Sequence, residues 1–395
     1  MRLLILTPGE LSLDPRARRA AAAAVRRGLE VDGVCPAQPG RAAVPLDGVR
    51  IERAGGTAVD SGLRRVGPAA PDADRHEGTL LREVRGLYRL ARLTATTIAL
   101  VRAARRLDRP DTVHANDLDT LPAATLIARR ARARLVYDAH ELYASFEADP
   151  PRLYRAAMLP LERALARRAD AVVTVSDPIA DELVRTLRLA RRPLPVLNCP
   201  ARSAAPGAAA TTDSQLRAVY QGSLGHGRHL ADLLDALAVA PDVKLTLLVP
   251  GIDRDAALAE AAGRGLAGRL HVPEAVAPDA VVAALAAHDV GLVIDRPGTR
   301  NVSLALPNKL FDYLMAGLAV IVPDLPGMAP LVREEDVGVA YVAGSAAGLG
   351  AALAALAADP PGLVATRRRA REAAVTRYCW EAQEDALARA WGVEP

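Results

Sequence analysis

The sequence alternates short apolar segments with longer amphipathic ones, and this alternation stops once near the middle of the chain and then resumes. Runs rich in Val, Leu and Ile are typical of strands buried on both faces, whereas the intervening segments have a helical period. The pattern predicts an α/β fold of parallel sheets covered by helices. The strands predicted in the first half are residues 3–7, 30–35, 112–114, 134–137, 171–175 and 195–197.

Helices are predicted between these strands, and the second half repeats the arrangement. The helices of the first half are residues 16–28, 79–107, 118–131, 152–168 and 178–189. The strands of the second half are residues 218–221, 244–249, 269–272, 291–294, 319–322 and 339–342. Its helices are residues 228–240, 255–265, 279–287, 307–316 and 348–358.

A stretch without periodicity separates the halves. Residues 199–213, CPARSAAPGAAATTD, are predicted to be a linker. We expect Rossmann-like domains over residues 1–198 and 214–375, and a C-terminal helix over residues 376–395 that crosses back to the N-terminal domain. Residues 36–77, rich in Gly and Pro, are predicted to form surface loops. Two doubly wound sheets of this kind would face each other across a cleft at the carboxyl ends of their strands, where ligands bind.

Composition excludes several classes of protein. The cysteines Cys35, Cys199 and Cys379 have neither CxxC nor metal-ligand spacing, so we expect no disulfide framework and no structural zinc. No uncharged apolar stretch of about 18 residues occurs, and the apolar run at residues 3–7 is too short for a signal peptide. We therefore expect a cytoplasmic protein without a transmembrane helix.

The positive charge is carried almost entirely by arginine, because only Lys244 and Lys309 among the 50 basic residues are lysines. The net charge is +4, yet residues 1–198 hold 33 arginines against 24 acidic residues, so residues 199–395 are net acidic. A basic average suggests nucleic acid as a partner. Aromatic residues make up only 3% of the chain and no lysine-rich patch occurs, so we expect no nucleic-acid binding.

A basic stripe lies along the predicted helix 79–107. Arg82, Arg85, Arg89 and Arg92 recur every three or four residues and therefore share one face. Such a face is typical of a solvated helix in an arginine-rich chain, which is the interpretation we favour. It also suits peripheral contact with anionic lipid at the inner face of the membrane, or with an acidic acceptor.

The most informative motif is VSLALPNKLFDYLMAGLAVIVPD. Pro307 is predicted to be the first residue of a helix, whose first turn exposes the backbone amides of Asn308, Lys309 and Leu310. With the Lys309 ammonium, these amides form an anion site, and Asp312 follows one turn later. These groups match the phosphates and ribose hydroxyls of a nucleoside diphosphate. The alternative is an ordinary helix in which Asp312 only complements the helix dipole.

A second candidate anion site is QGSLGHGR, which follows a predicted strand and opens a helix. Gly222, Gly225 and Gly227 permit close approach of a ligand to the backbone, and Arg228 supplies a positive charge. This is neither a GxGxxG nor a P-loop motif. The second half thus contains two helix starts suited to phosphate.

The ordered set of motifs resembles the family 4 glycosyltransferases, which have the two-domain GT-B fold. In the second half the resemblance is carried by YQGSLGHGRHLADLLDAL, HDVGLVI, LPNKLFDYLMAGLAVIVPDLPG and YCWEAQ. In the first half it is carried by DPRARRAAAA, HANDLDTLPAA, YDAHELYA and VVTVSDPIAD, and it leaves out about residues 36–109. It implies transfer of a sugar from a UDP- or GDP-linked donor to an acceptor with retention of anomeric configuration. The second half would then bind the donor and the first half the acceptor.

The resemblance implies roles for individual residues of the donor half. Arg228 matches a basic ligand of the diphosphate, whereas Ser223 stands where many members have a second one, an arginine. The implied diphosphate-binding residues are Gly222, Ser223, Arg228, Asn308, Lys309 and Leu310.

Two acidic positions of the family pattern bear on the ribose and the donor sugar. Asp312 matches the acid that holds the ribose, and Leu304 stands where the family has its other glutamate. The usual carboxylate contact to the donor sugar is therefore missing. The backbone amides of Val302, Ser303, Leu304, Ala305 and Leu306 are the candidates to replace it.

In the first half, polar side chains follow neighbouring strands and should lie at the same edge of the sheet. His114, Asn116 and Asp117 follow one strand, and His140 and Glu141 follow the next. The resemblance puts a catalytic histidine where Asn116 stands and matches His140 to another family histidine, so our candidate catalytic residues are His140, Asn116 and Asp117. A third group follows the first strand, where acceptor and donor meet in this fold: Gly9, Glu10 and Asp14. Asp14, before a proline, is equally a helix N-cap.

Retention is compatible with double displacement or with front-face transfer. Double displacement needs two carboxylates about 5 Å apart, and the motifs offer no matched pair. The resemblance implies front-face transfer, in which the departing phosphate oxygen deprotonates the acceptor. No metal and no cofactor are needed if Arg228, Lys309 and the helix-start amides stabilise the leaving diphosphate. Asp117 and Asp119 have DxD spacing but lie in the acceptor half.

The acceptor stays open at this point. A lipid-linked or polysaccharide glycan and a small natural product are both compatible with the sequence. The alternative functions are a GT-B nucleotide-sugar epimerase, an inverting transferase and a two-domain sugar-binding receptor.

Overall fold

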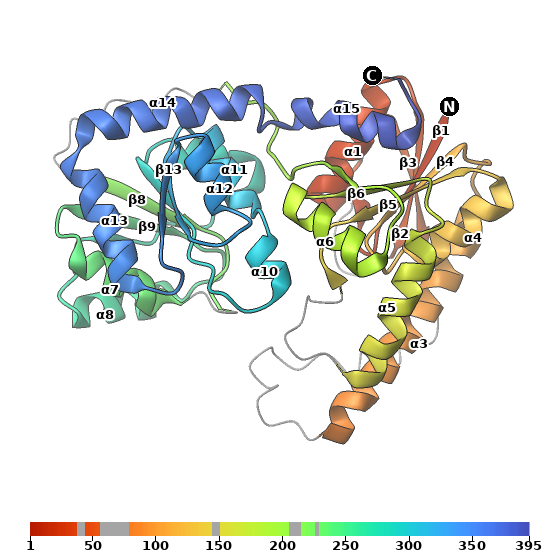
Figure 1. Cartoon of the computed structure of the whole chain (residues 1–395), viewed down its shortest axis with the longest axis horizontal. Coiled ribbons are helices and arrows are strands. Elements are labelled where there is room, and N and C mark those ends of the chain that lie inside the picture. The colour runs from red at the N-terminus through yellow and green to blue at the C-terminus, as the bar shows by residue number, and fades with distance from the viewer. Residues whose placement is uncertain (38–43, 56–78, 144–150, 205–214, 226–228, 395) are drawn as a thin grey trace. The chain divides into compact units, whose positions relative to one another are not determined.

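The computed structural model describes residues 1–37, 44–55, 79–143, 151–204, 215–225 and 229–394. These residues form two compact units. Unit 1 comprises Met1–Val196 and Glu384–Pro395, and unit 2 comprises Leu197–Gln383. Each is a parallel sheet with helices packed on it (Figure 1), so the predicted pair of doubly wound α/β domains is confirmed. Most of the predicted linker, residues 205–213, lies outside the described residues.

The sheet of unit 1 has seven parallel strands in the order β3-β2-β1-β4-β5-β6-β7. Its strands are β1 (Arg2–Leu6), β2 (Glu30–Pro36), β3 (Val49–Ala54), β4 (Thr112–Asn116), β5 (Arg134–Ala139), β6 (Ala171–Thr174) and β7 (Leu194–Pro195). The chain reverses its direction of progress between β1 and β4, which pair directly. In open α/β sheets this switch point is where ligands bind.

The helices of unit 1 agree with the predicted ones to within a few residues. They are α1 (Pro15–Arg26), α3 (Thr79–Ala104), α4 (Leu121–Ala131), α5 (Arg152–Ala166), α6 (Asp177–Leu187) and the end of α15 (Trp380–Trp391), with a short 3-10 helix at Leu11–Leu13. The start of α1 is fixed chemically, because the Asp14 carboxylate accepts hydrogen bonds from the amides of Arg16 and Ala17 and Pro15 needs no amide partner.

The segment predicted as loops, residues 36–77, contains a strand, and this prediction was wrong for β3. Residues 38–43 and 56–78 of that segment lie outside the described residues. β3 is an edge strand, and its charged side chains find partners: Arg50 pairs with Asp32 and Arg53 with Glu10. Because an edge strand is only half covered, it lacks the continuous apolar run that marks a central one.

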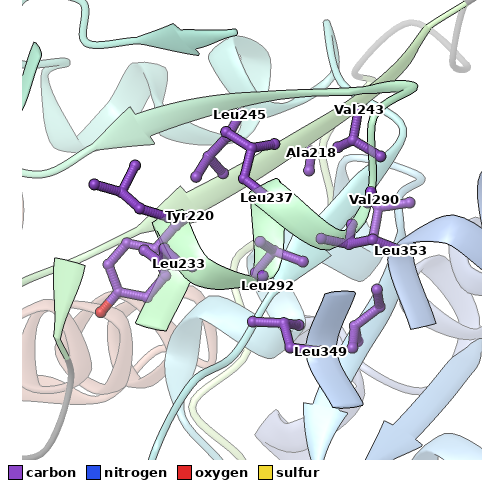
Figure 2. Close-up of a cluster of buried hydrophobic side chains, with 14 of the residues drawn as sticks. Ala218, Tyr220, Leu233, Leu237, Val243, Leu245, Val290, Leu292, Leu349 and Leu353 are labelled. Carbon is purple, nitrogen blue, oxygen red and sulfur yellow. The ribbon is translucent and has the colours of Figure 1, made fainter. Parts of the chain in front are cut away.

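The sheet of unit 2 has six parallel strands in the order β10-β9-β8-β11-β12-β13. They are β8 (Leu216–Gln221), β9 (Val243–Leu248), β10 (Leu270–His271), β11 (Val290–Leu292), β12 (Ala319–Pro323) and β13 (Gly338–Tyr341). Figure 2 shows leucines of the helices α7 (Leu230–Val239) and α13 (Ala346–Ala358) packed against side chains of β8, β9 and β11. Full burial of one such leucine contributes about 1.5–3 kcal/mol relative to exposure, so this cluster holds the two helices on the sheet.

Unit 2 has more helices than the periodicity predicts. They are α7 (Leu230–Val239), α8 (Arg254–Gly263), α9 (Val281–Leu285), α10 (Arg300–Leu304), α11 (Asn308–Met315), α12 (Ala329–Glu334), α13 (Ala346–Ala358) and α14 (Pro360–Thr376). The unpredicted α14 is anchored by a buried arginine. Arg367 donates to the carboxylate of Asp289 at 2.6 Å and to the carbonyl of Gly317 at 3.1 Å.

Two further observations bear on the composition. Cys35, Cys199 and Cys379 are buried free thiols. Among the described helices none is alone long and apolar enough to cross a membrane, and one pair bent by 103°, Ala346–Ala358 with Pro360–Trp391, meets that criterion only when taken together.

Candidate active site

The helix start predicted to bind an anion begins one residue later than expected. Pro307 is the N-cap of α11, with an extended backbone, and Asn308 is the first helical residue. The amide of Leu310 already donates to the Pro307 carbonyl at 3.0 Å. Of the three amides expected to bind an anion, those of Asn308 and Lys309 therefore remain, since the first amides of a helix have no partner within it.

Lys309 is buried, and the ring of Tyr220 fixes its position. Its Nζ lies 4.5 Å from the Tyr220 ring centroid and donates to the Tyr220 hydroxyl at 3.3 Å. That hydroxyl in turn donates to the carbonyl of Ser223 at 2.7 Å. The lysine of one predicted motif is thus held against the glycine-rich turn of the other.

Gly222 shows how closely the two motifs approach. Its φ is +108°, in the range that favours glycine, and a Cβ placed there would lie 3.4 Å from the Lys309 Nζ. The absence of a side chain leaves the backbone of this turn next to the lysine ammonium. An ammonium, two helix-start amides and a bare backbone turn form a cradle suited to an anion such as phosphate.

Asp312 lies beside a residue that the sequence did not single out. Gln221 donates from Nε2 to the Asp312 carboxylate at 3.2 Å. The backbone amide of Gln221 donates to the Tyr313 hydroxyl at 2.8 Å, and that hydroxyl donates to the Leu292 carbonyl at 3.1 Å. Within the described residues, the Gln221 Oε1 is buried without a hydrogen-bond partner. Gln221 directly precedes the glycine-rich turn, and this position in the sequence could have identified it as a site residue.

Tyr313 reaches Gln221 because it lies flat against β11. A Cβ at Gly291 would lie 2.2 Å from a Tyr313 ring carbon, so glycine is the residue that lets the ring pack onto the strand. The register of Gly291 opposite Val219 and Val320 keeps this contact at the centre of the sheet.

Not every predicted donor-half residue is available in this conformation. Arg228 and Gly227 lie outside the described residues. The Val302 amide donates to the Thr299 hydroxyl at 3.3 Å and the Ser303 amide to the Thr299 carbonyl at 3.1 Å. Leu304 is buried. The first two amides expected to contact a donor sugar are thus occupied by the cap of the short helix α10.

In unit 1 the predicted histidines converge on a buried carboxylate, that of Asp138 at the end of β5. Arg16 of α1 donates to both of its oxygens, at 2.8 and 2.9 Å. The Nε2 atoms of His114 and His140 lie 3.4 and 3.2 Å from its Oδ2. Burial would raise the pKa of Asp138, but Arg16 and His140 hold it well below its usual range.

His140 lies between two carboxylates. Its Nδ1 is 3.2 Å from the Asp117 Oδ1, and its Nε2 faces Asp138. Burial alone would lower the pKa of His140, but the two carboxylates outweigh it and raise the pKa to about 10. The ring is therefore an imidazolium near neutral pH and is not poised as a general base. Asp117 itself has a φ of +67°, a strained value for a residue with a side chain.

Asn116 and His114 are buried and have hydrogen-bond partners inside unit 1. Asn116 Nδ2 donates to the Leu6 carbonyl at 3.0 Å, which ties β4 to the end of β1. His114 Nδ1 accepts a hydrogen bond from the indole nitrogen of Trp391 at 3.0 Å. Of the five residues predicted here, Asp117, His140 and the neighbouring Glu141 are the ones only partly buried.

The predicted site residues that follow β1, which are Gly9, Glu10 and Asp14, all make hydrogen bonds within unit 1. Glu10 accepts hydrogen bonds from Arg53 at 2.8 and 3.0 Å and from Ser12 at 2.9 Å. Hydrogen bonds from Arg53 hold the pKa of Glu10 below its usual range, against the effect of burial. Asp14 caps α1, as its alternative interpretation held, and the Gly9 carbonyl accepts from Thr7 at 2.7 Å.

Two family models match successive parts of the chain. Residues 16–201 match the model of Glycosyltransferase Family 4, and residues 216–359 match the model of Glycosyl transferases group 1. No curated protein sequence matches.

Solved structures match over nearly the full length. Sucrose-phosphate synthase from Thermosynechococcus elongatus is 17% identical over 99% of this chain and 98% of its own, with a TM-score of 0.68. HepE from Anabaena, in complex with UDP, is 16% identical over 99% of this chain and 100% of its own, with a TM-score of 0.71. The glycotransferase of kitacinnamycin is 17% identical, covers 99% and 98%, and has a TM-score of 0.60.

The fold and the two successive family models define an enzyme of the glycosyltransferase class with the GT-B fold. The resemblance predicted from the motifs is thereby confirmed. The chain is a glycosyltransferase whose residues 16–201 belong to Glycosyltransferase Family 4 and whose residues 216–359 belong to Glycosyl transferases group 1.

Proposed function

We propose that the protein transfers a sugar from a UDP-linked donor to an acceptor nucleophile with retention of anomeric configuration. The observation that carries the donor half of this proposal is the cradle of Lys309, the α11 amides and Gly222, which suits a diphosphate. Asp312, held by Gln221, is the ribose contact. UDP is chosen over GDP because HepE, a structural relative, is known in complex with UDP and with UDP-glucose.

The proposed chemistry is front-face transfer. His140 is held as an imidazolium, so it does not remove the acceptor proton. The departing phosphate oxygen takes that proton while the new glycosidic bond forms on the face that the phosphate leaves. Lys309 and the helix-start amides stabilise the negative charge that develops on the diphosphate. This scheme needs neither a metal nor a cofactor.

For the acceptor, we propose a glycan or small natural product met in the cytoplasm, with peripheral membrane contact through α3. Three apolar side chains on this helix, Leu81, Val84 and Leu87, are each slightly more than half exposed. They alternate with arginines in a pattern that suits an anionic lipid surface. Sedimentation with phosphatidylglycerol vesicles should capture the wild type and lose Leu87→Gln, while Val364→Gln in unit 2 keeps binding.

The function is tested by incubating the protein with UDP-glucose and GDP-glucose, with and without simple acceptors. We expect release of UDP and a product, or a hydrolysed sugar, of retained configuration by proton NMR. Inverted configuration would identify an inverting transferase. A change in the nucleotide-sugar without UDP release would identify an epimerase, and tight binding without any turnover a receptor.

A further inference from the structure

The last turn of α15 is attached to the sheet of unit 1 by three hydrogen bonds. The carbonyls of Ala390 and Trp391 accept from Arg134 at 2.7 Å and from Thr112 at 3.2 Å, the first residues of β5 and β4. The Trp391 side chain is buried and donates from its indole nitrogen to His114 Nδ1 at 3.0 Å. The two rings meet edge to face at 69°. A residue near the end of the chain is thus bonded directly to a residue of the candidate site.

This bond decides which nitrogen of His114 carries the proton. The indole nitrogen can only donate, so His114 Nδ1 must be the acceptor and the proton of the neutral ring lies on Nε2. Nε2 faces the Oδ2 of Asp138 at 3.4 Å. His114 therefore presents an N–H, and not a lone pair, to the carboxylate.

The same oxygen of Asp138 also faces His140, at 3.2 Å from its Nε2. Arg16 holds the carboxylate from its other side through both oxygens. Arg16 therefore fixes the orientation of the Asp138 carboxylate, while His114 Nε2 approaches the same Oδ2 at 3.4 Å without the geometry of a hydrogen bond. His140 faces this carboxylate, so a change in the proton carried by His114 Nε2 changes the charge distribution that His140 meets. The groups that face His140 are Asp138, with Arg16 and His114 behind it, and Asp117, which Tyr143 contacts.

We propose that Trp391 is a positioning residue for His140, and that it acts through the His114 tautomer and the Asp138 carboxylate. A part for His140 in sugar transfer is what the family resemblance implies, and it rests on the proposed function above, in which His140 acts as a fixed positive charge and not as a base. The contacts run from Trp391 through His114 and Asp138 to the partly exposed His140. All four residues belong to unit 1, and none of them is part of the donor cradle in unit 2. Loss of the indole N–H should therefore change His140 and turnover but leave nucleotide binding intact.

The test variant is Trp391→Phe, which keeps an aromatic ring and removes the N–H donor together with part of the buried ring volume. Trp380→Phe is the matched control, because Trp380 is buried, lies on the same helix and is the other tryptophan of the chain. Ring nitrogens are observed by nitrogen-15 NMR of histidine-labelled protein. In the wild type we expect His114 with its proton on Nε2. In Trp391→Phe we expect a mixed tautomer for His114 and shifted ring signals for His140.

Turnover gives the second measurement. With UDP-glucose as substrate, Trp391→Phe should lower kcat about tenfold and leave the Kd for UDP within about twofold of the wild type. Trp380→Phe should change neither the His140 signals nor this ratio. Unchanged His140 signals and unchanged kcat in Trp391→Phe would overturn the proposal.

A measurement on the wild type protects the test against a variant that does not fold. The scalar coupling across the hydrogen bond between Trp391 Nε1 and His114 Nδ1 should be observable, and its absence would also overturn the proposal. The NMR measurements need no substrate. If His140 responds to Trp391→Phe but no sugar nucleotide is turned over, the proposed function fails and the positioning relationship stands.

Discussion

The ammonium of Lys309 lies over the ring of Tyr220, 4.5 Å from its centroid, and is hydrogen-bonded to the same tyrosine's hydroxyl. The tyrosine comes from β8 and the lysine from α11, 89 residues later. This contact joins the two motifs that the sequence offered separately. It also makes the lysine a fixed charge, because an aromatic face and a hydroxyl together restrict a side chain that is otherwise flexible.

Replacing Lys309 tests whether that charge binds the nucleotide. Lys309→Met should weaken UDP binding at least about tenfold, because a charge-assisted contact to phosphate is lost. Lys244→Met is the natural control, since Lys244 is the other lysine of the chain and lies exposed on β9. Isothermal titration calorimetry with UDP measures both. Equal affinities in the two variants would remove Lys309 from the donor site.

Gly222 tests the close approach of the turn to the lysine. Gly222→Ala puts a Cβ 3.4 Å from the Lys309 Nζ at a φ of +108° and should reduce UDP affinity about tenfold or more. Gly265→Ala is the control for backbone strain alone, because its φ is +73° and its Cβ would meet nothing within 4 Å. Both should lose about 1–2 kcal/mol of folding free energy. A nucleotide affinity reduced equally in both would mean that strain, and not the cradle, is responsible.

Glu162 provides a pH-dependent prediction about stability. Its carboxyl group is buried beside the Tyr137 hydroxyl at 2.9 Å, and burial raises its pKa to about 7 although the tyrosine bond lowers it. Because the folded pKa exceeds the unfolded one, the folded protein keeps a proton that the unfolded chain loses as the pH rises from about 4.5 to about 7. The wild type should therefore lose stability over this interval, and the loss is complete above it.

The variant Glu162→Gln removes this titration. Its stability relative to the wild type should increase by about 2–3 kcal/mol between about pH 4.5 and about pH 8, measured by urea unfolding. Glu260→Gln, which breaks an exposed ion pair with Arg264, should change by less than about 1 kcal/mol over the same range. A pH-independent difference for Glu162→Gln would show that the carboxyl group is not protonated in the fold.

The buried arginine of α14 predicts that alanine substitutions at two neighbouring positions lower the free energy of unfolding by very different amounts. Arg367→Ala should cost about 3–5 kcal/mol, because it leaves the Asp289 carboxylate with less compensation inside unit 2. Arg368→Ala, one position along and exposed, should stay within about 0.5 kcal/mol of the wild type. Thermal unfolding followed by circular dichroism compares them. Similar midpoints for the two variants would contradict the role given to the ion pair.

Most of the fold follows from apolar periodicity, and the exceptions have identifiable causes. The central strands are buried on both faces, so their runs of Val, Leu and Ile are continuous in the sequence. β3 was not predicted because an edge strand mixes charged and apolar residues and has no continuous apolar run. The partners of its Arg50 and Arg53, which are Asp32 and Glu10, lie in other parts of the sequence. α14 was not predicted because its buried face includes Arg367, a residue that a hydropathy pattern places in solvent.

The residues of the candidate site could be predicted only where a single local motif contains the signal for their role. Lys309 and Gly222 were found because helix starts and glycine-rich turns have local signals. Arg16, Asp138 and Gln221 were missed because their roles depend on partners far away in the chain. Glu10 shows the reverse case: its position after β1 suggested a ligand contact, but Arg53 from the unpredicted β3 occupies both of its oxygens.

The contribution of α15 to unit 1 has a consequence for how the protein is made. A ribosome delivers residues 197–383, the whole of unit 2, before it delivers the turn that carries Trp391. During synthesis His114, Thr112 and Arg134 therefore lack their partners Ala390 and Trp391 until the whole of unit 2 has been synthesised. Unit 1 begins to fold first and is finished last, so any exposed apolar surface near His114 must be tolerated, or covered by a chaperone, for the whole of that interval.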